Sequence, residues 1–163
     1  MDEPVAISAP WEITGARHGG VTVSDLDRSL EFYVGLVGLE LVWRREYVND
    51  EIRAITGTDA ISVDIAMLDI PGGGAQVELL EYKGCERKSG SGPPCDYGTG
   101  HFCVFVRNIE ACHAELAAQG VRFRSDGPVE MREGPNTGGK SLYGIDPDGY
   151  IFEFHERPPR VAA

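Results

Sequence analysis

The sequence HGGVTVSDLDRSLEFYVGLVGLEL, from His18 to Leu41, decides the fold because a related stretch returns in the second half of the chain. The second stretch reads HFCVFVRNIEACHAELAAQGVRF and runs from His101 to Phe123. In each, a short apolar strand that begins with a histidine leads through a polar turn into an amphipathic helix. Such self-similarity predicts two copies of one structural unit.

Local signals predict where the two helices begin and end, at about 25–36 and 108–119. Ser24 and Asp27 have the spacing of a capping box before the first helix. Asn108 is a favourable N-cap for the second helix, and Gly120 is a favourable residue to end it.

Three strand-like runs follow each predicted helix, so each half reads β-α-β-β-β and the chain is predicted to have an α+β fold. The runs are 39–48, 60–70 and 75–82 in the first half, and 121–125, 141–147 and 150–156 in the second. Module one is expected at about 15–82 and module two at about 100–157. The linker between them, at about 83–99, is rich in Gly, Ser and Pro. We expect residues 1–163 to form a single domain.

The charge balance excludes several classes of partner. The 163 residues include 15 Lys and Arg against 26 Asp and Glu, a net charge of −11. A chain so acidic is repelled by nucleic-acid phosphates and by anionic membrane surfaces. It also shows no apolar stretch as long as a membrane span, and its acidic start is unlike a signal peptide. We therefore expect a cytoplasmic protein without nucleic-acid or membrane partners.

The four cysteines, Cys85, Cys95, Cys103 and Cys112, are too few for a disulfide scaffold and are expected to be reduced thiols. A disulfide between Cys85 and Cys95, which flank the Gly- and Ser-rich segment of the linker, is the less favoured alternative. Cys103 lies in an apolar run and is predicted to be a small core residue.

Four polar residues recur at equivalent places in the two halves. His18 and His101 begin the first strand of each half, and Glu78 and Glu153 lie in the last. A carboxylate within an apolar strand is costly to bury unless it is paired or binds a cation. Two imidazoles and two carboxylates suit one divalent ion such as Zn, Ni, Co, Mn or Fe, and leave two octahedral positions open for substrate. The competing interpretation is that all four are ordinary polar residues of a sheet surface.

At this level the sequence resembles the vicinal oxygen chelate superfamily over about residues 15–157. The stretch beginning at His18, with Ser-Asp-Leu-Asp at its turn, resembles the opening module of that superfamily. GTGHFCVFVRNIEACHAELAAQGVRF resembles the start of its second module. GKSLYGIDPDGYIFEFHE resembles its closing strands, in which DPDG precedes a glutamate that binds metal.

The resemblance implies two βαβββ modules that form a cupped mixed sheet around a metal site, in a protein that is expected to be a homodimer. Glyoxalase I-type lyases and methylmalonyl-CoA epimerases are the nearest classes. In both, a carboxylate removes a proton next to a carbonyl group of a small-molecule substrate. The motif match carries the four metal positions of glyoxalase I over to His18, Glu78, His101 and Glu153.

Further roles also follow from the resemblance. Glu153 is the first candidate for the catalytic base and Glu78 the second. In such proteins a mobile loop lies at the mouth of the cup. Lys140 belongs to the matching loop of this chain and Tyr143 follows it, so both are candidates to contact substrate. Independently of the resemblance, His155 lies two residues after Glu153 and so points to the same side of the strand. It is expected to be a surface residue at the strand end, and a partner that supports a metal ligand is the alternative.

Two departures from the family patterns leave the substrate open. The separate glutamate of the epimerases falls near Ala60, with only Asp59 beside it. No clear cluster of basic residues is present for the carboxylates of glutathione; Arg17, Arg44 and Lys140 are the candidates. The sequence therefore predicts a metal-dependent lyase or isomerase of glyoxalase type whose substrate is not specified.

Two other functions remain open. A ring-cleaving dioxygenase needs Fe(II) held by two histidines and one carboxylate, for which His18, His101 and Glu153 suffice. Glu78 would then be a fourth ligand that this chemistry does not need. A drug-binding resistance protein, which needs no metal, is the non-catalytic alternative.

Overall fold

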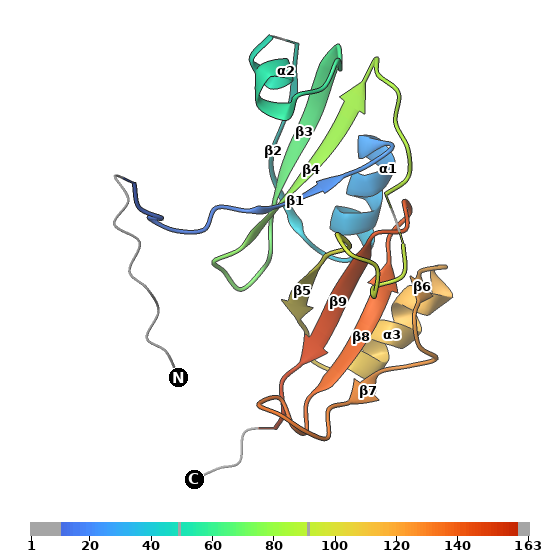
Figure 1. Cartoon of the computed structure of the whole chain (residues 1–163). Helices are drawn as coiled ribbons and strands as arrows, with labels where there is room; N and C mark the ends of the chain where they lie inside the picture. The colour runs from blue at the N-terminus through green and yellow to red at the C-terminus, as the bar shows by residue number, and fades with distance from the viewer. Residues whose placement is uncertain (1–10, 49, 91, 160–163) are drawn as a thin grey trace.

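The computed structural model describes residues 11–48, 50–90 and 92–159, and its first sheet carries module one (Figure 1). Its strands stand in the order β1-β4-β3-β2. β1 pairs with β4 in parallel, whereas the other neighbours are antiparallel. The strands are β1 (Gly19–Thr22), β2 (Glu40–Tyr47), β3 (Ser62–Asp69) and β4 (Gln76–Lys83).

The second sheet repeats this pattern in module two, in the order β5-β9-β8-β6. β5 pairs with β9 in parallel, as β1 does with β4, and a short β7 adds to β8. Two βαβββ modules and the α+β class are thus confirmed, and the strands form two mixed sheets rather than one continuous sheet. The strands are β5 (His101–Phe105), β6 (Arg122–Phe123), β7 (Val129–Glu130), β8 (Lys140–Ile145) and β9 (Ile151–Glu156).

The helix of each module forms where the sequence predicts it. α1 (Leu26–Leu30) continues directly into a π-helical segment, η1 (Glu31–Leu36). α3 (Ile109–Ala118) begins at the predicted cap, because the Asn108 side chain accepts a hydrogen bond from the Ala111 N–H.

The predicted cap of α1 is wrong by one residue. Asp25, and not Ser24, accepts the hydrogen bond from the Arg28 N–H. Ser24 turns outward and donates its hydroxyl to Asp148 of module two. A second short helix, α2 (Asp50–Thr56), and the two-residue β7 were not predicted.

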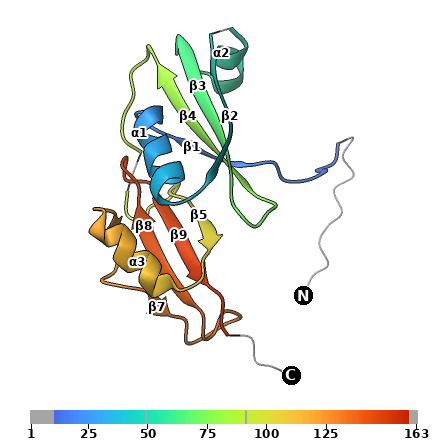
Figure 2. The same ribbon diagram turned by 180° about the vertical axis from the view of Figure 1, so that it is seen from behind.

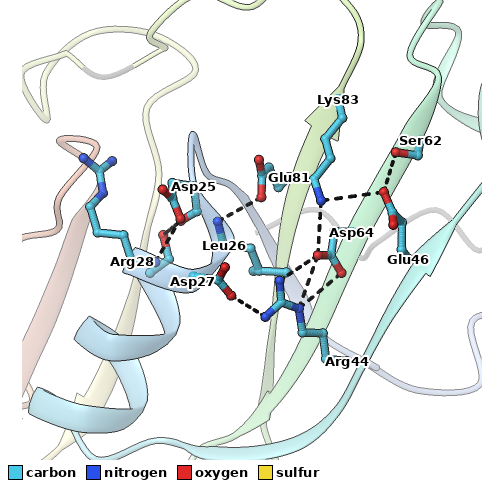
Figure 3. A network of polar contacts seen from close by, with 11 residues as sticks. Asp25, Leu26, Asp27, Arg28, Arg44, Glu46, Ser62, Asp64, Glu81 and Lys83 are labelled. Atoms are coloured by element: carbon cyan, nitrogen blue, oxygen red, sulfur yellow. Dashed lines mark hydrogen bonds and ion pairs between the residues drawn. The ribbon is translucent and has the colours of Figure 1, made fainter.

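Charged side chains fix α1 to the sheet of module one (Figure 3). The Arg44 guanidinium lies between Asp64 of β3 and Asp27 of α1 and pairs with both carboxylates. Glu81 of β4 accepts the N–H of Leu26, the first residue of the helix. Because these residues come from β2, β3, β4 and α1, the network joins three of the four strands of module one to its helix.

The two modules meet at α1 and η1, which contact residues of module two (Figures 1 and 2). The Tyr33 hydroxyl donates to Asp146 at 2.9 Å, and the Phe32 ring packs edge-on against Phe152 with centroids 5.6 Å apart. Burial raises the pKa of the Asp146 carboxyl, and burial together with the charge of that carboxyl raises the pKa of Tyr33. One continuous core therefore spans both modules.

One face of each sheet packs against the core, and the side chains that alternate with the core residues lie on the opposite face, where a site can form. In β4, Val77 and Leu79 are buried toward the helix, so Glu78 lies on the opposite face. In β9, Phe152 and Phe154 are buried in the core, and Glu153 lies opposite. We call these opposite faces the cup faces. Among the described residues, no helix is long and apolar enough to cross a membrane.

Candidate metal centre

The first pair of predicted ligands comes together on the cup face of module one. His18 directly precedes β1, two residues before Gly20, which stands beside Glu78 in the strand register. The His18 Nε2 lies 3.3 Å from the Glu78 Oε2, and the two side chains are 26% and 17% exposed. The parallel pairing of β1 with β4 thus places an imidazole and a carboxylate side by side.

The second pair occupies the equivalent place in module two. His101 begins β5, two residues before Cys103, which stands beside Glu153 in the register. The His101 Nε2 lies 3.4 Å from the Glu153 Oε2. The predicted equivalence of the two halves therefore extends to the geometry of these side chains.

The two pairs do not converge within one chain. Over residues 11–48, 50–90 and 92–159, no three His, Cys, Asp or Glu side chains are grouped closely enough to hold a metal ion. One chain presents two His–Glu pairs, one from each module, and each supplies two of the four predicted ligands.

Each pair fits the donor chemistry of a divalent ion. A nitrogen and an oxygen that each lie about 2.1 Å from one ion are about 3.0–3.4 Å apart for right-angled to tetrahedral geometry. The observed separations of 3.3 and 3.4 Å fall in that range. Neutral imidazole and carboxylate are also the ligand types that borderline divalent metals accept.

The surroundings of the second pair contain two further polar groups. The Tyr143 hydroxyl lies 3.4 Å from the His101 Nε2, with ring centroids 5.0 Å apart. Cys103 lies next to Glu153, and burial together with that charge raises the pKa of the Cys103 thiol to about 12. The prediction that Cys103 is a core residue was wrong, because the residue is exposed on the cup face and only its thiol is partly shielded from solvent. Its position two residues after His101 was a signal for the same face.

Other candidate residues lie elsewhere. Lys140 pairs with Glu110 of α3, on the helix side of β8 and not on the face of Tyr143. Arg44 belongs to the network that holds α1. Arg17 lines a hollow of about 530 Å³ beside the β3–β4 turn. These residues do not form a basic cluster.

His155 departs from the expected surface position. It is only 6% exposed, and its Nδ1 lies 2.7 Å from the Ser141 Oγ on the neighbouring strand. Its ring also meets Phe105 edge-on, with centroids 5.8 Å apart. Neighbouring side chains cover the end of β9 in this fold. The position of His155 near the end of the chain gave no sign of this burial.

Two proteins of known name are similar to this chain in sequence. A 2-epi-5-epi-valiolone epimerase from Actinomyces sp is 30% identical over 146 residues, 87% of this chain and 79% of its own. A lactoylglutathione lyase from Schizosaccharomyces pombe is 29% identical, and the match covers 84% of this chain but 45% of that enzyme. The chain thus spans about half the length of the yeast enzyme.

A solved structure and a family profile agree with these relatives. A glyoxalase family protein from Bacillus cereus superposes with a TM-score of 0.77 at 20% identity, covering 93% of this chain and 99% of its own. The profile of the glyoxalase/bleomycin resistance protein/dioxygenase superfamily matches residues 15–154. With the repeat of βαβββ modules already established, the match over nearly the whole described chain makes this protein a member of that superfamily.

Proposed function

We propose that this protein is a divalent-metal-dependent lyase or isomerase that removes a proton next to a carbonyl group of a small molecule. The observation that carries the proposal is the pair of equivalent His–Glu contacts, at 3.3 and 3.4 Å, on the cup faces of the two modules. The two relatives are named as an epimerase and a lyase, and removal of such a proton is a step compatible with both names.

His18, Glu78, His101 and Glu153 would hold the ion. When bound, the metal would supply a Lewis acid that stabilises negative charge on a substrate oxygen. Glu153 is the first candidate to take the proton and Glu78 the second. Each carboxylate is about one-sixth exposed, at 16% and 17%, so each remains accessible to substrate yet is shielded from much of the solvent.

The complete site is proposed to form between two copies of the chain. Each chain supplies two ligands from each module, and its two pairs lie apart. If module one of one copy faces module two of another, a two-fold symmetric dimer contains two complete sites. This arrangement also explains why the two cup faces carry equivalent ligand pairs.

Metal analysis of the protein, purified without a histidine tag, tests the site directly. We expect about one equivalent of Ni, Zn, Co, Mn or Fe per chain. His101→Ala and Glu153→Ala should each lose it, whereas Lys140→Met, on the helix side, should retain it. Iron with O₂-dependent ring cleavage would contradict the lyase and isomerase assignment. Failure to bind any of the five ions after reconstitution would overturn the proposal and leave the non-catalytic binding protein.

Mixing two inactive variants tests the dimeric site. Neither His18→Ala nor His101→Ala should have a complete site alone. After the subunits exchange at random, half of the dimers are mixed and each has one intact site, so metal binding should return at about a quarter of all sites. Recovery in the mixture supports a site between copies. No recovery, when mass spectrometry shows mixed dimers, would place each site within one chain.

A further inference from the structure

The two glutamates of the proposed site differ in their neighbours, although their strands are equivalent. In module one, Glu78 stands between Gly20 of β1 and Met67 of β3. Neither of these side chains carries a hydrogen-bond donor. The space beside Gly20 is open enough that an added Cβ would lie 3.9 Å from the Glu78 Oε2.

In module two, the same two positions carry donors. Glu153 stands between Cys103 of β5 and Tyr143 of β8. The Cys103 side chain thus stands directly beside Glu153 on the cup face. The Tyr143 hydroxyl lies 3.4 Å from the His101 Nε2. The two register positions that flank Glu153 therefore carry protic side chains, whereas the two that flank Glu78 do not.

A metal ion held by the His101 Nε2 would take away this nitrogen as a hydrogen-bond acceptor for the Tyr143 hydroxyl. The lone pair of Nε2 that accepts a hydrogen bond is the same lone pair that binds a cation. In the loaded protein the phenol then needs another acceptor on the cup face. A substrate oxygen at the second pair would provide one.

We infer that Tyr143 is a substrate-contacting residue that donates a hydrogen bond to the carbonyl oxygen of the substrate. This inference rests on the proposed function. It adds that the residues of module two carry out the proton transfer in each site. The substrate class that it implies carries an acidic C–H next to a carbonyl group.

The chemical step balances without any further reactant. Glu153 takes the proton, and the electron pair of the broken C–H bond moves toward the carbonyl oxygen, where negative charge develops. A phenol that donates to this oxygen stabilises the charge without giving up its proton. Glu153 then returns the proton to the same or the neighbouring carbon. The two positions that flank Glu78 in the strand register, Gly20 and Met67, offer no such donor to a substrate oxygen.

Binding of a simple probe to the Co(II)-loaded protein tests this inference without measuring turnover. Acetohydroxamate presents two neighbouring oxygens, one of them a carbonyl oxygen, and its binding is followed through the visible absorption of Co(II). We expect Tyr143→Phe to weaken its affinity about fivefold, the size of one lost neutral hydrogen bond, with unchanged Co(II) bands before the probe is added. Tyr82→Phe is the matched control, because Tyr82 lies on the cup face of module one, where burial and the nearby charge of Glu78 raise its pKa.

Each outcome separates this inference from the function on which it rests. Unchanged affinity in Tyr143→Phe, with normal Co(II) bands, overturns the inference and leaves the metal site in place. Loss of the bands in that variant overturns it too, because Tyr143 would then support the ligands and not the probe. Equal weakening in Tyr82→Phe also contradicts it. Absence of Co(II) bands in the wild type would overturn the proposed function and this inference together.

Discussion

The two modules share one strand order, yet different forces attach their helices. Module one adds charges to the apolar packing of α1, with Arg44 between Asp27 and Asp64 (Figure 3). In module two, α3 makes a surface ion pair through Glu110 to Lys140, while the sheet beneath it packs Phe152 and Phe154 into the core. A repeated fold thus keeps its backbone pairing and its ligand positions, while the interactions that stabilise each copy differ.

Removing the central cation of module one should have the largest effect. Arg44→Met leaves Asp64, whose side chain is only 7% exposed, with Lys83 as its remaining cationic partner. We expect a loss of about 2 kcal/mol in the free energy of unfolding, less than for a fully buried pair because Arg44 is partly exposed. Urea denaturation measures the change.

Arg45→Met is the matched control, because Arg45 is the next residue of β2 and faces the cup, over the Tyr47 ring. We expect it to change stability by less than about 0.5 kcal/mol. Equal losses in the two variants would show that module one does not depend on the charges around Asp64.

Lowering the pH should affect the stability contributions of Asp64 and Asp146 in opposite directions. The hydrogen bonds from Arg44 lower the pKa of Asp64, so its contribution to stability is present above its unfolded pKa and is lost as pH falls through the folded value. Burial raises the pKa of Asp146, so its contribution is complete below its unfolded pKa and is lost as pH rises through the folded value. Asp64→Asn should therefore reduce the loss of stability between pH 7 and pH 3, and Asp146→Asn should increase it.

Urea midpoints across this range, each compared with the wild type at the same pH, measure both effects. Because each variant is referred to its own value at pH 7, a general weakening of the fold cancels. A change of slope in the same direction for both variants would contradict the assignment.

The smallest effect is expected for the ion pair of module two. Lys140 and Glu110 meet at the surface, where solvent screens the attraction. Lys140→Met should leave the urea midpoint within experimental error at low and high salt. A midpoint lowered as far as that of Arg44→Met would remove the distinction between the modules.

The local part of this structure was predictable from the sequence. Apolar alternation around Glu78 and Glu153 placed each carboxylate opposite the core, and the repeat of His18 at His101 predicted the equivalent pairs. These features depend on strand period and on neighbouring strands of one module, which short stretches of sequence specify.

Features that depend on distant parts of the chain were not predictable in the same way. Ser24 and Asp25 are both good caps, and the choice is settled by Asp148, which accepts from Ser24 across 124 positions of sequence. The burial of His155 depends on Ser141 and Phe105 of neighbouring strands. α2 is only seven residues long, too short for helical periodicity to distinguish it from a loop. Whether the two ligand pairs meet depends on how modules pack, which no local pattern encodes.

The contact between Tyr33 and Asp146 has a consequence for the order of folding. The two residues are 113 positions apart, and the hydrogen bond joins the first helical region to a turn before the last strand. During synthesis, Phe32 and Tyr33 emerge long before β9, whose Phe152 packs against them. Both aromatic side chains of module one therefore stay exposed until β9 is in place. Long-range closure of this kind slows folding. The chain therefore depends on its last strand to complete its first module.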